Sequence, residues 1–504
     1  MANGLNKELD TEKRKWSVEQ DTKYKNIDDS IIMNYKEVKL MEAKRTVHME
    51  EEQLQYPRVL VIANNCFSKS SSNGRTLGNF FRGWPKDKLA QFYISGDNLD
   101  FTVCEHFFNV TDGQALSAFK SGKCSGGVVN IRTSTREDAK KTENARNSEN
   151  TAIANSTQSS PSNGKTTTPR NSITMMLRNM IWRSGRWKNS GFDEWVKRFA
   201  PEIVLLQAGD FAFMYDLSLK VAKEQNAKLV IYNSEGYYFK NFDYFKSRGI
   251  AKRMYPIFLS NLKKALRKAY VNTEHIFYAC DELTREYANE FNIPSETIYT
   301  ASDMAISPAI TENKEFTISY CGNLGLDRHK GLIEVASALQ EISPDLYIDV
   351  YGRAREKRVE DELKACSGIR FHGFVQYDVV NQIIAGSDLV LHVESFDDFY
   401  KEDLKFGFST KIADLLSSGK CFLLYAPDCY ACSRYLIENK AAYVVSKKSD
   451  LKETLIEIIK NPRSREKYRQ NALELAEKNH RSKKNVLRFQ TVLCDVAKRA
   501  EVSQ

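Results

Sequence analysis

Residues 408–425 read Phe-Ser-Thr-Lys-Ile-Ala-Asp-Leu-Leu-Ser-Ser-Gly-Lys-Cys-Phe-Leu-Leu-Tyr, a pattern that predicts a capped helix leading directly into a short buried strand. Ser409 or Thr410 suits the N-cap, because its hydroxyl can accept a hydrogen bond from a first-turn N–H. Gly419 is expected to end the helix, since glycine adopts the left-handed backbone conformation that follows many helices.

The start of this helix has the properties of an anion site. Its exposed N–H groups and dipole attract negative charge, and Lys411 adds a full positive charge. Asp414 lies one turn beyond Thr410 on the same face. A diphosphate at the helix start and a sugar hydroxyl at the carboxylate would together match a nucleotide-sugar.

A second segment, residues 319–334, reads Ser-Tyr-Cys-Gly-Asn-Leu-Gly-Leu-Asp-Arg-His-Lys-Gly-Leu-Ile-Glu and stands between a predicted strand and a predicted helix. That is the context of a phosphate-binding glycine loop. Gly322 and Gly325 permit close backbone approach, while Arg328 and Lys330 supply positive charge. The alternative is an ordinary glycine-rich turn with surface cations.

The two segments resemble, in order and spacing, the C-terminal donor motifs of retaining glycosyltransferases with two Rossmann-like domains, the GT-B architecture. The group 1 branch that builds bacterial capsules and exopolysaccharides looks most similar. The resemblance covers residues 316–480 well and residues 57–305 weakly. It implies donor-binding roles for Gly322, Asn323, Gly325, Phe374, Val375, Ser409, Thr410, Lys411 and Asp414.

The resemblance also implies an acceptor side in the first half of the chain. Asn73-Gly74-Arg75-Thr76 resembles a loop that faces the donor phosphates and the acceptor, although a simple turn explains it equally well. Glu235 follows a predicted strand and is expected to contact the acceptor. We therefore assign Gly74, Arg75 and Glu235 to the acceptor side.

Two departures from the family pattern concern the catalytic residues. Asn323 stands where relatives usually have an arginine, so Arg328 and Lys330 are expected to supply the charge that stabilises the leaving group. Phe406 stands where relatives carry the first of two acidic residues. Glu394, at the end of a predicted strand, is the best substitute for that carboxylate, because ligands bind at the carboxyl ends of such strands.

The chain has 504 residues, which is too long for one core and favours two domains with extensions. We expect an α/β fold in which two Rossmann-like domains face a cleft. Residues 1–56 form a charged N-terminal extension, and residues 57–305 an acceptor domain with a polar insertion at 121–172. A donor domain at 306–480 and a C-terminal helix at 481–504 complete the expected organisation.

The composition of the chain indicates which classes of partner and which cellular compartment to expect. The 74 Lys plus Arg against 65 Asp plus Glu leave a net charge of +9, and no nucleic-acid recognition motif is present. Ten scattered cysteines are typical of free thiols in a reducing cytoplasm, and we expect neither a secretory signal nor a spanning helix. Residues 173–188 combine two tryptophans, apolar bulk and four cations. They suit a helix at an anionic membrane surface or, equally, a helix packed on its own domain.

The expected function is transfer of a sugar from a nucleotide-diphosphate sugar to a glycan or lipid-linked acceptor, with retention, in surface polysaccharide synthesis. No metal or cofactor is expected, because cationic side chains take the place of Mg²⁺. Two alternatives stay open. One is a sugar-nucleotide epimerase on the same scaffold, and the other is a non-catalytic nucleotide-binding partner of a polysaccharide assembly complex.

Overall fold

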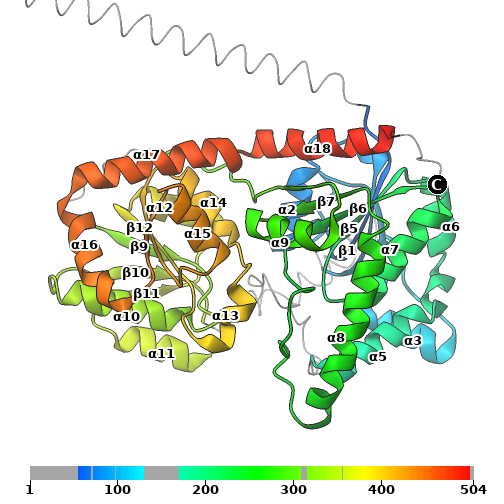
Figure 1. Cartoon of the computed structure of the whole chain (residues 1–504), viewed down its shortest axis with the longest axis horizontal. Helices are drawn as coiled ribbons and strands as arrows, with labels where there is room; N and C mark the ends of the chain where they lie inside the picture. Colours follow the sequence, from blue (N-terminus) through cyan, green and yellow to red (C-terminus); the bar gives the residue numbers. More distant parts are fainter. Residues whose placement is uncertain are drawn as a thin grey trace, which may run out of the picture. The chain divides into compact units, whose positions relative to one another are not determined.

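The computed structural model describes residues 55–69, 72–96, 98–129, 170–307, 315–354 and 356–499. The predicted N-terminal extension and most of the predicted insertion lie outside the described residues, so the structure does not bear on either prediction. Helix and strand labels below follow Figure 1, which draws the whole chain coloured along the sequence.

The first sheet is built from residues 59–297. Its strands are β1 (Val59–Asn65), β2 (Leu89–Ser95), β3 (His106–Asn109), β4 (Gly127–Val129), β5 (Ile203–Gln207), β6 (Lys228–Asn233), β7 (His275–Tyr278) and β8 (Ser295–Thr297). Their order in the sheet is β4-β3-β2-β1-β5-β6-β7-β8. Every pair is parallel except β3 with β4. The strand order reverses between β1 and β5, as in a Rossmann-like sheet.

The helices of the first half follow its strands along the chain. They are α2 (Ser72–Phe80), α3 (Asp112–Ser121), α5 (Ser172–Arg183), α6 (Phe192–Phe199), α7 (Ala212–Glu224), α8 (Gly249–Tyr270) and α9 (Asp281–Phe291), with short 3-10 turns at Lys86–Lys88 and Arg186–Ser190. The sequence did not predict β3, β4 and β8, which have three or four residues each and are too short for a clear alternation of apolar positions.

The second sheet is built from residues 318–445 and is parallel throughout. Its strands are β9 (Ile318–Cys321), β10 (Ile348–Tyr351), β11 (Ile369–Gly373), β12 (Leu389–Val393), β13 (Cys421–Tyr425) and β14 (Tyr443–Val445). Their order is β11-β10-β9-β12-β13-β14, so the direction of winding reverses between β9 and β12. All six strands were predicted, because their short apolar runs are typical of strands buried on both faces.

The helices of the second half alternate with these strands. They are α10 (Arg328–Gln340), α11 (Lys357–Ala365), α12 (Tyr377–Ala385), α13 (Asp398–Leu404), α14 (Thr410–Ser417), α15 (Ala431–Glu438), α16 (Leu451–Lys460), α17 (Pro462–Asn479) and α18 (Ser482–Lys498), with a 3-10 turn at Lys448–Asp450. The two sheets with their helices confirm the predicted pair of Rossmann-like units. The exact domain boundaries stay predictions.

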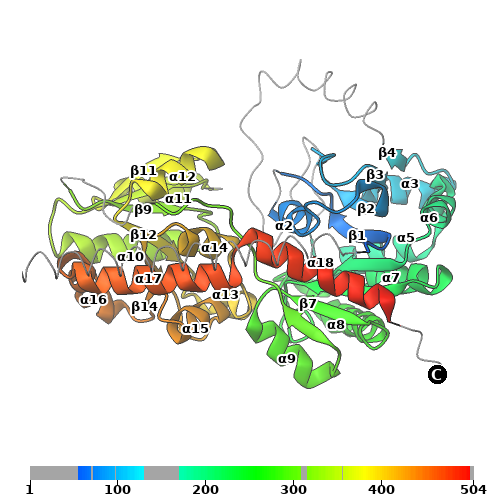
Figure 2. The same ribbon diagram turned by 90° about the horizontal axis from the view of Figure 1, so that it is seen from above.

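The last helix, α18, packs on the first half of the chain rather than on the second. The ring of Phe489 is fully buried and lies 4.9 Å from Phe80 and 4.6 Å from Phe277, both residues of the first half. Gln490 donates hydrogen bonds to the carbonyls of Phe80 and Arg82. Figures 1 and 2 show this helix, in red, beside α2 and β7. The last helix thus joins the end of the chain to its first half.

Candidate functional site

The carboxyl ends of β9 and β12 lie next to each other at the point where the second sheet reverses its strand order. Ligands of parallel α/β sheets bind at such a point. The loop after β9 contains Gly322 and leads into α10, and Glu394 follows β12 directly. The two segments that the sequence singled out therefore meet at one edge of the sheet.

Glycine is required where the loops after β9 and β10 approach each other. A Cβ at Gly322 would stand 2.7 Å from Lys411 Nζ and 2.7 Å from Tyr320 Oη. A Cβ at Gly352 would overlap the carbonyl oxygen of Gly322. The glycine loop and the start of α14 are thus close neighbours, as the sequence predicted for two turns that share one ligand.

The remaining glycine-loop residues shape the backbone. Asn323 Oδ1 accepts a hydrogen bond from the Gly325 N–H at 2.9 Å, and Tyr320 Oη donates to the Asn323 carbonyl at 2.8 Å. Leu326 and Asp327 adopt positive φ values of 60° and 57° just before α10. Asn323 consequently stabilises the turn from within, which differs from the charge that relatives place at this position.

Arg328 and Glu394 form a buried ion pair at the centre of the site. Arg328 Nε and Nη2 lie 2.9 and 2.7 Å from Glu394 Oε2, and His392 Nε2 lies 2.9 Å from Oε1. Burial alone would raise the pKa of the Glu394 carboxyl, yet Arg328 and His392 hold it at about 2. Burial lowers the pKa of His392. The carboxylate of Glu394, which was predicted to contact the sugar, is therefore already paired with Arg328 and His392. The charge of Arg328 is neutralised by this ion pair.

Lys411 supplies the positive charge that this ion pair does not neutralise. Its side chain is partly buried at the glycine loop, as the close approach to Gly322 shows. Burial and the neighbouring Arg328 lower the pKa of the Lys411 ammonium to about 8, although Glu394, Cys321 and Asp414 act in the opposite direction. A lysine held in this way gains stability from an added anion.

The helix that carries Lys411 begins and ends as predicted, with one difference. Ser409 occupies the N-cap position, but its side chain makes no capping hydrogen bond, so the expected hydroxyl cap is wrong. Thr410 opens the first turn, and Gly419 follows the helix with φ 73°. Asp414 Oδ1 accepts a hydrogen bond from Ser302 Oγ at 2.6 Å. Ser302, in the segment between the two sheets, is a partner that the sequence did not suggest.

Lys330 lies in the first turn of α10 and its side chain is 56% exposed. Its ammonium contacts Asp327 Oδ2 at 2.8 Å and Asp397 Oδ2 at 3.9 Å. Lys330 is thus available to a ligand at the end of the sheet, with two acidic residues beside it.

Phe374 and Val375 follow β11, at the same edge of the sheet. The Phe374 ring is 37% exposed, and the Arg353 guanidinium lies over it at 4.9 Å. An exposed aromatic ring next to the strand ends is a suitable surface for a nucleotide base.

Phe406, which replaces an acidic residue of the family pattern, is buried against the first half of the chain. A Cβ at Gly236 would stand 2.5 Å from the Phe406 ring, and the Phe406 carbonyl accepts a weak hydrogen bond from Cys280 Sγ at 3.8 Å. The adjacent Lys240–Asp403 ion pair, at 2.8 Å, also joins the two halves. Phe406 consequently packs where a carboxylate would contact a ligand.

Glu235 lies beside this contact, directly before Gly236. Burial raises the pKa of its carboxyl to about 7, opposed by Lys240 and reinforced by Asp403 and Asp210. Its backbone is held by a hydrogen bond from its own N–H to Asn233 Oδ1 at 3.0 Å. Glu235 therefore presents a carboxyl that changes its charge near neutral pH.

The predicted loop around Gly74 and Arg75 is wrong, because both residues belong to α2. The polar run before Leu77 looked like a loop, since it lacks apolar residues. It forms instead the start of a helix, in which Gly74 is buried and Arg75 half-buried, and the apolar residues come later. Gly74 and Arg75 stay near the carboxyl end of β1, but on a helix.

The sequence missed a polar cluster at the carboxyl end of β5. Asp210 is buried and forms an ion pair with Arg170, and Tyr244 Oη donates to Asp210 Oδ2 at 3.3 Å. Arg170 lies near the C-terminal end of the predicted polar insertion at 121–172, for which the sequence predicts no helix or strand. An acidic residue three positions beyond a strand is the signal that could have revealed this cluster.

The two tryptophans of residues 173–188 do not support the interpretation of this segment as a membrane-surface helix. Trp182 and Trp187 are buried in the core, at 3% and 2% exposure. Arg178 and Arg183 form ion pairs with Asp112 and Asp216. The structure thus places the two tryptophans in their own domain, which was the alternative.

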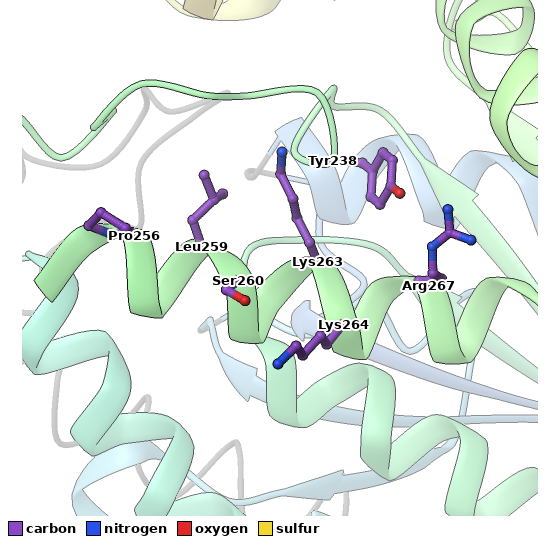
Figure 3. A pocket seen from close by; sticks show the side chains of 7 residues that line it. All are labelled: Tyr238, Pro256, Leu259, Ser260, Lys263, Lys264 and Arg267. Carbon is purple, nitrogen blue, oxygen red and sulfur yellow. The ribbon is translucent and has the colours of Figure 1, made fainter.

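Three further observations concern metal sites, membrane spans and hollows. Within the described residues, no group of three or more His, Cys, Asp or Glu side chains is arranged to hold a metal ion. In the same part of the chain, no helix is long and apolar enough to cross a bilayer. A hollow of about 370 Å³ lies along α8, away from the donor-site residues described above. It is lined by Tyr238 and by side chains of α8 (Figure 3).

Comparison with known proteins agrees with this geometry. The profile of the family described as "Glycosyl transferase-like" matches residues 328–491, about a third of the chain. No curated protein sequence matches significantly.

Solved structures match over nearly the whole chain. HepE from Anabaena has a TM-score of 0.54 at 11% identity, over 87% of this chain and 100% of its own. Sucrose-phosphate synthase from Thermosynechococcus elongatus has a TM-score of 0.53 at 10% identity, over 86% and 98%. A glycosyltransferase from Rickettsia africae has a TM-score of 0.51 at 12% identity, over 88% and 100%. The chain thus has the two-sheet GT-B fold of these structures, and its second half matches a glycosyltransferase family model.

Proposed function

We propose that the chain transfers a hexose-type sugar from a nucleotide-diphosphate sugar to a glycan or lipid-linked acceptor. The observation that carries this proposal is the meeting of Lys411 Nζ with the glycine loop at Gly322, beside the amide groups that open α14. A diphosphate fits such a combination of one uncompensated cation and converging backbone N–H groups.

The donor would lie along the carboxyl edge of the second sheet. Its base would stack near Phe374 and Val375, and its ribose hydroxyls would bind the Asp414 carboxylate. Its diphosphate would lie between Gly322, Asn323 and Gly325 on one side and Ser409, Thr410 and Lys411 on the other. HepE was crystallised with UDP and with UDP-glucose, so a uridine diphosphate donor is the first to test.

In the reaction, the acceptor oxygen forms a bond to the anomeric carbon as the bond from that carbon to the diphosphate breaks. Lys411 and Lys330 stabilise the charge that develops on the leaving diphosphate. The acceptor proton passes to a diphosphate oxygen, which needs no protein nucleophile and favours retention. Cationic side chains perform the charge stabilisation that Mg²⁺ provides elsewhere, so we propose that no metal ion is needed.

Arg328 acts in this proposal through Glu394. The pair keeps Glu394 ionised and in a defined position next to the predicted sugar site, and Glu394 can accept a hydrogen bond from a sugar hydroxyl with its Oε1 edge. His392 Nε2 lies 2.9 Å from that same Oε1, so the imidazole and the sugar hydroxyl would share this oxygen. In this proposal, Glu394 takes the role of the acidic residue that relatives carry at the position of Phe406.

Glu235, with Gly74 and Arg75 at the start of α2, would face the acceptor. We further propose that the enzyme acts in the cytoplasm in surface polysaccharide synthesis. No disulfide bond occurs in the described part of the chain, which suits a reducing compartment.

The decisive experiment is a transfer assay with a panel of radiolabelled nucleotide-sugars and membrane extract as acceptor, on the wild type and on Lys330→Ala. We expect transfer from one donor, reduced at least about tenfold in the variant. Lys364→Ala is the matched control, because Lys364 is equally exposed and also pairs with an acid one turn away. Isomerisation of the donor without transfer would identify an epimerase, and tight binding without turnover would identify a non-catalytic partner.

A further inference from the structure

The outer face of α8 carries positive charge without any negative charge. The helix contains six Lys or Arg residues and no Asp or Glu over 22 positions. Ile250, Arg253, Ile257, Ser260 and Lys264 follow one another at intervals of three and four, so they form a single stripe along the helix. This stripe faces solvent.

Most of these cations have no acidic partner. In the described part of the chain, no ion pair involves Lys252, Arg253, Lys264 or Lys268. Arg267 pairs with Glu290, which itself accepts a hydrogen bond from Tyr238 Oη. A helix of 22 residues is about 33 Å long, so the unpaired charge extends over a large surface.

The same face exposes large apolar side chains. Ile250 is 72% exposed and Ile257 is 49% exposed, and both stand on the same stripe as Arg253 and Lys264. Pro256 and Leu259 line one end of the neighbouring hollow, and Tyr238, Lys263 and Arg267 line the other (Figure 3).

We propose that the exposed face of α8, defined by Ile250, Lys252, Arg253, Ile257, Lys264 and Lys268, docks on an anionic lipid bilayer. Lipid headgroups neutralise the cations, while the isoleucines enter the boundary between headgroups and acyl chains. A soluble polyanion would satisfy the lysines and arginines but would leave the isoleucines in water. The surface is independent of the donor site, so its test does not depend on the proposed reaction.

The test is sedimentation of the full-length protein with vesicles of phosphatidylcholine alone or mixed with phosphatidylglycerol. We expect binding to the mixed vesicles only, and weaker binding at higher salt. One variant combines Lys252→Glu, Arg253→Glu, Lys264→Glu and Lys268→Glu. It should bind the mixed vesicles on the order of a hundredfold more weakly.

The control combines Lys460→Glu, Arg463→Glu, Lys467→Glu and Lys478→Glu, on exposed positions of α16 and α17. Each set reverses four charges, so both lower the formal net charge from +9 to +1. We expect the control to bind at least ten times more tightly than the α8 variant. Equal weakening of the two would overturn the proposal, because net charge alone would then explain binding.

A second variant separates lipid docking from simple charge attraction. Ile250→Ser with Ile257→Ser keeps every cation, and both side chains are exposed, so folding should be unaffected. We expect binding to mixed vesicles to fall about tenfold or more. Unchanged binding in this variant, or absence of vesicle binding by the wild type, would contradict docking on a bilayer.

Discussion

Lys411 is the residue on which the donor site depends most. Its ammonium is partly buried, approaches the glycine loop, and is not neutralised by the neighbouring Arg328–Glu394 pair. A buried cation lowers the free energy of unfolding when no ligand is bound. It strengthens the binding of an anion, because the opposite charge stabilises it. Affinity and stability are therefore expected to respond in opposite directions when its charge is removed.

We predict that Lys411→Met weakens UDP binding by about ten- to a hundredfold, the usual range for one charge-assisted hydrogen bond. The melting temperature should stay equal or rise, because methionine has a similar length and removes a buried charge. Calorimetric titration and thermal unfolding measure the two effects. Unchanged affinity in a folded variant would show that the diphosphate lies elsewhere.

The pKa of about 8 for Lys411 gives the wild type a characteristic pH dependence. A bound diphosphate raises that pKa, so binding is strongest below about pH 8 and takes up a proton above it. We expect the UDP affinity of the wild type to fall as pH rises from about 7 to about 9, and the affinity of Lys411→Met to stay nearly constant. Titration in buffers of different ionisation enthalpy counts the proton.

Glu235 is predicted to control the acceptor side through its own charge. Its pKa is raised to about 7, so the carboxylate that can accept a hydrogen bond from an acceptor hydroxyl forms only above that pH. The KM for the acceptor should fall as pH rises through 7 in the wild type, and Glu235→Gln should remove this dependence. A pH profile unchanged by the substitution would exclude this role.

At the scale of elements, close contact between two strand ends builds the glycine loop. Gly352 follows β10 and touches the Gly322 carbonyl, so the position of one loop fixes the position of the other. A side chain at this position cannot be accommodated by a rotamer change, because the obstacle is backbone.

We therefore predict that Gly352→Ala displaces the glycine loop and weakens UDP binding at least about tenfold, with a loss of stability of about 1–3 kcal/mol. Gly113→Ala is the control, because Gly113 lies in the first turn of α3, where an added Cβ would meet only Thr111 Oγ1, in an ordinary contact at 3.9 Å. Alanine there should be neutral or favourable for the helix. Equal UDP affinity of the two variants would show that the contact is not needed for the site.

At the scale of the whole molecule, α18 joins the end of the chain to its first sheet. Phe489 lies fully buried between Phe80, Phe81 and Phe277. The first half of the chain therefore completes its core with a residue that follows the entire second half, so it is incomplete without α18.

We predict that Phe489→Ala destabilises the protein by about 3–5 kcal/mol, as expected for a large side chain removed from a packed core. Lys483→Ala, on the exposed face of the same helix, should change stability by less than about 0.5 kcal/mol. Urea unfolding followed by tryptophan fluorescence reports the difference, since all five tryptophans lie in residues 1–195. A small effect in the Phe489 variant would mean that α18 contributes little to the first half.

The sequence by itself determined most of the second half. Apolar runs marked all six of its strands, and the pattern of Gly322, Lys411 and Gly419 marked two turns that the structure does bring together. This succeeded because parallel strands buried on both faces leave an unbroken apolar run, and because the chain order of strands and helices limits where their ends can lie.

Only the tertiary structure decided how the charged groups are paired. Arg328 and Glu394 are 66 residues apart, and nothing local indicates that the predicted phosphate ligand would bind the predicted sugar ligand instead. The same holds for Ser302 with Asp414, for Gly236 under Phe406, and for Gly74 and Arg75 in a helix. Local patterns record which face of an element is buried, whereas the partner of a charged or polar side chain depends on the packing of distant segments, which a single sequence does not display.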